Sequence, residues 1–117
     1  MRVSPDARSW FERAVFDLAI AKAHLQSQLW SEAGQYSRQA ALKFLQSALV
    51  QTGHLEPAPR MNDLLAEVRE RYPTLETGDD WDILDRFVSA RETSKEEAVQ
   101  AYAISEAVRD EIARLLG

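Results

Sequence analysis

Apolar residues recur at helical spacing through most of this chain, and that periodicity restricts its fold more than any other feature. At about 100° per residue, one stripe of the first segment carries Phe11, Ala14, Leu18, Ala21 and Leu25. The segment opens on Ser4, Pro5 and Asp6. These supply a hydroxyl N-cap, a proline suited to the first helical position and a carboxylate at the positive end of the helix dipole. The chain is therefore expected to begin with a long helix.

The second helix is expected to start near Ser31 and Glu32 and to run to Gly53, which suits the position that follows a helix end. Its stripe is made mostly of small side chains, which allow a neighbouring helix to approach closely: Ala33, Ser37, Ala40, Ala41, Phe44, Ala48 and Leu49. Pro57 and Pro59 then exclude a helix. A short third helix that carries Leu64, Leu65, Val68 and Tyr72 is expected to stop at Pro73.

The fourth helix is expected to start at Asp79 or Asp80 and to carry Trp81, Leu84, Phe87 and Val88. Ser94 and Glu97 form a capping box, in which each side chain bonds the other's backbone N–H, and they open the last helix. No strand pattern or internal repeat is present in the sequence. The prediction is an all-α fold with one domain over residues 1–117. It is an up-and-down four-helix bundle with a short extra helix.

Composition excludes several classes of protein. The chain has no cysteine, so disulfides and thiolate-bound metals are ruled out. A net charge of −5 weakens the attraction to phosphates on which non-specific nucleic-acid binding depends. No apolar run approaches the roughly 20 residues that span a bilayer, so a cytoplasmic protein without membrane contact is expected. Asp79, Asp80 and Asp82 are explained by a helix start, and neither a metal site nor a cofactor is expected.

Three short patterns follow one another in the order and spacing of a known family. They are Trp10 followed by Ala14-x-x-Asp17-Leu18-x-x-Ala21, then Gln39-Ala40-x-x-Lys43-x-Leu45, then Leu84-Asp85-x-Phe87 with Arg91 behind it. On these patterns the sequence resembles the HEPN family, named for higher eukaryotes and prokaryotes nucleotide-binding proteins. The resemblance covers residues 10–53 best and extends more loosely to residue 91, with Leu42 in place of the family's usual acidic residue. It implies an up-and-down bundle that pairs as a homodimer, often beside a minimal nucleotidyltransferase.

Many members of that family are RNases, with an arginine followed after four to six residues by a histidine. The resemblance implies a histidine that moves a proton of the 2′-hydroxyl and an arginine that stabilises charge on the phosphate. Neither His24 nor His54 has an arginine at that spacing, and no histidine follows Arg91 as far as Ala98. The motif is absent, so no catalytic residue is assigned and the sequence favours a protein that is not an enzyme.

Four residues are candidates for binding an anion or a nucleotide: Arg91, Lys43, Arg38 and Gln39. Arg91 matches the family's functional arginine at the end of the fourth helix, although a cation there also complements the negative end of the helix dipole. Gln39 and Lys43 share a face of the second helix and are able to hydrogen-bond a ligand. A solvated face or a polar pair at a dimer contact is the simpler explanation of these two residues.

Phe16 and Ile20 form a second apolar face on the first helix, nearly opposite the stripe that contains Leu18. Either a second chain covers this face, or the last helix or the N-terminal segment of the same chain does. We expect a homodimer around Phe16 and Ile20, because a twofold interface uses the same patch on both partners. The small-residue stripe of the second helix is expected to let the two chains approach at the same seam.

The sequence therefore predicts a non-catalytic, homodimeric binding subunit. The resemblance implies a partner role for a minimal nucleotidyltransferase or in a toxin–antitoxin module. Two alternatives remain open: an RNase with an atypical active site around Arg91, and a nucleotide- or nucleic-acid-binding domain that uses Arg38, Lys43 and Arg91.

Because the spaced arginine and histidine are absent, the purified protein should not cleave RNA in the absence of metal ions. Labelled RNA incubated with EDTA and with successive fractions of the final chromatographic peak measures this. Cleavage that follows the protein peak and disappears in Arg91→Ala would support the atypical RNase instead.

Overall fold

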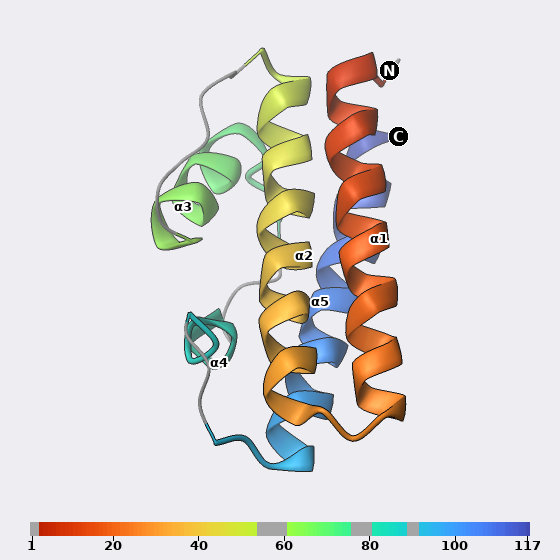
Figure 1. Ribbon diagram of the computed structural model, residues 1–117. Helices are drawn as coiled ribbons and strands as arrows, with labels where there is room; N and C mark the ends of the chain where they lie inside the picture. The colour runs from red at the N-terminus through yellow and green to blue at the C-terminus, as the bar shows by residue number, and fades with distance from the viewer. Residues whose placement is uncertain (1–2, 54–60, 76–80, 89–91) are drawn as a thin grey trace.

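Three helices of equal length form the body of the protein. In the computed structural model, which describes residues 3–53, 61–75, 81–88 and 92–117, α1 (Pro5–Gln26), α2 (Trp30–Gln51) and α5 (Lys95–Leu116) each have 22 residues. α1 and α2 are antiparallel, and α5 runs antiparallel to α1 (Figure 1). The shorter α3 (Met61–Arg71) and α4 (Trp81–Asp85) lie on the side of α2 away from α1. These ranges contain no strand, and the predicted all-α bundle with a short extra helix is confirmed.

The ends of the helices follow the predicted local signals in most places. The Ser4 hydroxyl accepts the Ala7 N–H at 3.1 Å, which caps α1. Ser94 and Glu97 make the predicted capping box at the start of α5. Gly53 follows α2 with a φ of +89°, a conformation that an L side chain rarely adopts. Residues close to the helix ends in sequence therefore determine three of these ends.

Two helix boundaries differ from the prediction. α2 begins one residue early, at Trp30, and its N-cap Leu29 makes no side-chain capping bond. α4 ends at Asp85, so Phe87 and Val88 lie outside it. Beyond Asp85 the backbone makes i→i−3 bonds, from Phe87 N–H to the Leu84 carbonyl and from Val88 N–H to the Asp85 carbonyl. This tightening ends the helix and directs Phe87 back to the bundle.

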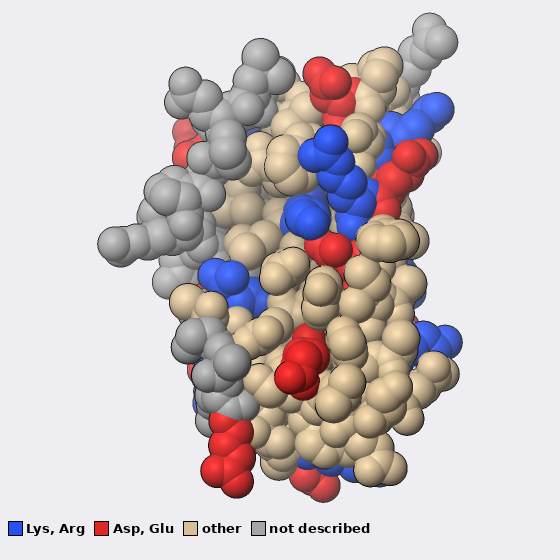
Figure 2. Space-filling view, viewed as in Figure 1, with Lys and Arg blue, Asp and Glu red and all other residues tan. Residues whose placement is uncertain are grey.

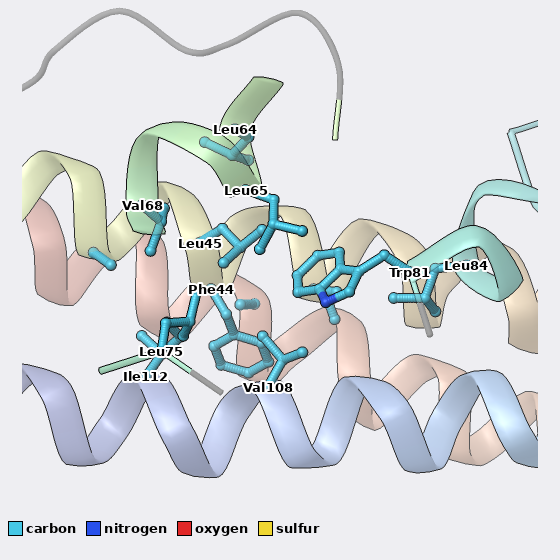
Figure 3. Close-up of a cluster of buried hydrophobic side chains, with 14 of the residues drawn as sticks. Phe44, Leu45, Leu64, Leu65, Val68, Leu75, Trp81, Leu84, Val108 and Ile112 are labelled. Carbon is cyan, nitrogen blue, oxygen red and sulfur yellow. The ribbon is translucent and has the colours of Figure 1, made fainter. Parts of the chain in front are cut away.

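The core is centred on Phe44, which has no exposed surface. Its ring meets Phe11 of α1 edge-on, with the ring centroids 4.9 Å apart. Around it, apolar side chains from α2, α3, α4 and α5 converge in a single cluster, as Figure 3 shows. Two buried hydroxyls on α2 bond its own backbone: Ser37 to the Ala33 carbonyl and Ser47 to the Phe44 carbonyl. They therefore lie in the core without unpaired polar atoms.

The segment between α2 and α5 also makes specific contacts with α2. About halfway along it, the Tyr72 hydroxyl donates to the Ala48 carbonyl at 3.2 Å. Burial raises the pKa of Tyr72, so the phenol keeps the proton that it donates. Near its end, the Phe87 ring lies directly on Gly34 of α2, and a Cβ atom at position 34 would overlap that ring. None of the helices in the described part of the chain is long and apolar enough to cross a bilayer.

Replacing Phe44 or Leu18 with alanine should lower the free energy of unfolding by about 2–5 kcal/mol, because each change leaves a cavity in the packed core. Urea denaturation followed by circular dichroism measures the loss. The control is Val99→Ala on α5, a side chain that is 45% exposed, which should cost no more than about 0.5 kcal/mol. Losses as small as the control at both core positions would contradict this assignment of the core.

Candidate functional site

The outer surface of α1 and α2 carries the most exposed apolar side chain of α1. Phe16 is 67% exposed, while Leu18 and Ala14 on the opposite side of the helix are buried. Ile20 is half-buried beside it. Neither the last helix nor the described N-terminal residues cover Phe16. We call this surface, defined by Phe16, Ile20, Tyr36, Gln39 and Lys43, the α1–α2 face.

The charges on this face are unevenly distributed. Figure 2 shows acidic and basic side chains gathered toward the end where α1 begins. The surface over the C-terminal half of α1 and the N-terminal half of α2 has few charged side chains in the same view, apart from an acidic group over α2. There His24 stacks on Tyr36 with ring centroids 5.4 Å apart, which places this histidine at the boundary between the two helices. A surface with few charged groups beside an exposed phenylalanine is suited to contact with another protein.

An ion pair links the two helices at the border of the charged region. Lys43 Nζ lies 2.5 Å from Asp17 Oδ2. The Asp17 side chain is only 8% exposed, whereas that of Lys43 is 32% exposed. The carboxylate therefore depends on the lysine for charge compensation, while the lysine retains contact with water.

A hollow of about 310 Å³ lies next to this pair and beside Phe16. Arg13 and Lys43 line it together with Glu12 and Asp17. The guanidinium of Arg13 also lies 5.3 Å from the centroid of the Trp10 ring. Two cations and two carboxylates leave the hollow without net charge, so nothing in it selects an anion over a cation.

Among the described candidates for anion binding, Gln39 and Lys43 share the α1–α2 face, and Arg38 lies apart from them. Arg38 lies on the other side of α2 from Lys43, where its Nε is 3.8 Å from Asp85 Oδ1 of α4. That ion pair is too long for a hydrogen bond, and Arg38 Nε has no hydrogen-bond acceptor among the described residues. Gln39 is exposed on the α1–α2 face. Arg91 lies outside the described residues, as do His54, Asp79 and Asp80.

The prediction that the small-residue stripe on α2 takes part in a dimer interface is wrong. Ala33, Ala40, Ala41 and Ala48 have no exposed surface within a single chain. They pack against α1 and α5 and let these helices approach α2 closely, which leaves nothing of the stripe for a second copy. Among the described residues, no group of three or more His, Asp or Glu side chains is arranged to hold a metal ion.

The Asp17–Lys43 pair is the feature that sequence reasoning missed. Both residues belong to the patterns quoted above, one on each of the first two helices. Each carries an isolated charge next to a residue of the apolar stripe, Leu18 or Phe44. Two opposite charges, each beside a buried position on one of two adjacent antiparallel helices, could have indicated that Asp17 and Lys43 form an ion pair.

Asp17 is the more deeply buried partner. Replacing Lys43 should therefore lower the free energy of unfolding more than replacing Asp17 does. Lys43→Met leaves a buried carboxylate unpaired and should cost about 1–3 kcal/mol of unfolding free energy. Asp17→Asn should cost less, because the lysine is free to turn toward water. Asp85→Asn, which breaks the longer and more exposed pair, is the control and should cost less than about 1 kcal/mol. Urea denaturation measures all three, and equal losses for Lys43→Met and Asp17→Asn would contradict the asymmetry.

The comparisons with known proteins agree with this architecture. Among solved structures, the chain is similar to that of TT1696 from Thermus thermophilus, with 21% sequence identity and a TM-score of 0.82. The alignment covers 95% of this chain and 98% of that one, and at this identity the likeness shows the fold. No curated protein matches the sequence significantly. The model of the HEPN domain matches residues 7–115, so this chain belongs to the HEPN domain family.

Proposed function

We propose that this HEPN protein acts by binding and not by catalysis, as a homodimeric subunit that pairs through the α1–α2 face. The observation that carries the proposal is the position of Phe16. A phenylalanine that is 67% exposed stands one turn before Ile20, on a surface formed by two packed helices and next to the charged hollow. Burying each such ring against a second copy would contribute about 1.5–3 kcal/mol, and one twofold axis buries two of them.

The Asp17–Lys43 pair supports this use of the surface. It fixes α1 against α2 beside Phe16, so the face that a partner meets is already rigid before binding. A preformed surface loses less conformational freedom on association than a mobile one does. Gln39, exposed on the same face, supplies a polar group for the rim of the interface.

The homodimer would in turn serve as a partner subunit for a minimal nucleotidyltransferase or in a toxin–antitoxin module, a role that membership of the family supports. The nucleotide- or nucleic-acid-binding alternative has less support, because Lys43 and Arg38 already face carboxylates on opposite sides of α2. The RNase alternative rests on Arg91, which lies outside the described residues.

Light scattering at micromolar concentration tests the dimer. The unmodified protein should have twice the mass of one chain, and Phe16→Glu should be a folded monomer. Removing two rings from the interface should weaken dimerisation about 100-fold or more. Val88→Glu is the matched control, since Val88 is also 67% exposed but lies beyond α4, and this variant should remain dimeric. A monomeric unmodified protein, or a monomeric Val88→Glu, would refute the α1–α2 interface.

A further inference from the structure

A second surface lies at the end of the bundle where α1 ends and α5 begins (Figure 1). It is an open groove of about 390 Å³, which we call the α1–α5 groove. Its lining includes four apolar or aromatic side chains and two lysines: Leu25, Trp30, Val99, Tyr102, Lys22 and Lys95.

Helix spacing and one unusual turn residue build this groove. Lys95, Val99 and Tyr102 stand at positions i, i+4 and i+7 and so share one face of α5. On α1, Lys22 and Leu25 are three residues apart and also share a face. Between α1 and α2 the chain turns through Gln28 with a φ of +61°, which is uncommon for a residue other than glycine. This turn places Trp30, the first residue of α2, in the lining of the groove.

The groove combines apolar surface with unpaired positive charge. Among the described residues, no carboxylate pairs with Lys22 or Lys95, and no acidic side chain lines the groove. Lys95 is the first residue of α5, where a cation opposes the helix dipole and costs helix stability. The acidic residues of that turn lie outside the lining, and Glu97 is bonded to Ser94. The chain as a whole has a net charge of −5, so a groove lined by two lysines and no acidic residue has the opposite sign of charge.

Tyr102 adds no negative charge to the groove. Its pKa is raised above the usual value, first by burial and then by the nearby carboxylate of Glu106. The phenol is therefore neutral at physiological pH. The groove presents a neutral aromatic ring, an indole and two ammonium groups to whatever enters it.

We propose that the α1–α5 groove binds a peptide segment of a partner protein in which acidic residues alternate with apolar ones. The apolar floor takes the apolar side chains, and Lys22 and Lys95 pair with the carboxylates. An open groove suits an extended segment better than a small molecule, which needs a site that encloses most of its surface. Two lysines are too few for a lipid surface, whose recognition takes clusters of about four to eight basic residues.

This groove is separate from the proposed dimer interface. Lys22 follows Phe16 by six residues, which places the two side chains about 120° apart around α1. Val99, 45% exposed, is the exposed hydrophobic residue of the groove, as Phe16 is of the α1–α2 face. Peptide binding in the groove therefore does not require the homodimer, and the homodimer does not require peptide binding.

Titration of ¹⁵N-labelled protein with a blocked synthetic peptide of mixed Glu and Leu residues tests the proposal. The Trp30 indole signal and the Val99 amide signal should shift. The same peptide with Gln in place of Glu should bind about tenfold more weakly, as should the acidic peptide to the double variant Lys22→Gln/Lys95→Gln. The control is Arg71→Gln/Arg86→Gln, which removes the same charge from two exposed positions elsewhere and should bind as the unmodified protein does.

Four results would overturn the proposal. The first is absence of binding, and the second is equal weakening by both double variants, which would reflect overall charge alone. The third is tight binding of vesicles of phosphatidylserine in place of the peptide, which would assign the groove to a membrane. The fourth is a change of oligomeric state in Lys22→Gln/Lys95→Gln, which would assign it to a second copy of the chain.

Discussion

The structure depends on the enclosure of one helix, α2. Twelve of its 22 residues are buried, compared with five in α1 and seven in α5. A helix buried on so many sides must be surrounded, and the small side chains along it allow α1 and α5 to approach while Phe44 fills the space between them. The other elements are arranged around this requirement. α3 and α4 complete the enclosure on the side that the two long helices do not reach.

Enclosure of α2 also explains which surfaces remain free. α1 has one side on α2 and another on α5, and its third side faces solvent with Phe16 upon it. The Asp17–Lys43 pair lies where this free side meets α2. Residues that resemble a family signature therefore have a structural use here that is independent of any chemistry: Leu18 packs in the core, and Asp17 and Lys43 join two helices.

Most of the fold could be predicted from the sequence, because its determinants are local. Ser4, Gly53 and the Ser94–Glu97 capping box mark helix ends by their own geometry, and periodicity identifies buried positions such as Leu18 and Phe44. What the sequence did not disclose depends on partners that are distant along the chain. The early end of α4, the burial of the alanine stripe and the pairing of Asp17 with Lys43 are all of this kind.

The surfaces, too, differ in whether they are determined by local sequence or by residues that are distant along the chain. The exposure of Phe16 follows from its position on the helix, so helical spacing was sufficient to point to it. The α1–α5 groove has no motif, because its residues come from the end of one helix, a turn and the start of another. The separation of Arg38 from Lys43, in contrast, follows from helical spacing, since residues five apart on a helix point about 140° away from each other.

The contact between Gly34 and Phe87 has a consequence for the evolution of the chain. The two residues are far apart in sequence, yet the ring occupies the space that any side chain at position 34 would need. Neither position is free to change alone: a larger residue at 34 displaces the ring, and a smaller residue at 87 leaves a void above the glycine. In the descent of this fold the two sites should therefore change together, and a relative that has lost the glycine should have lost the aromatic ring as well.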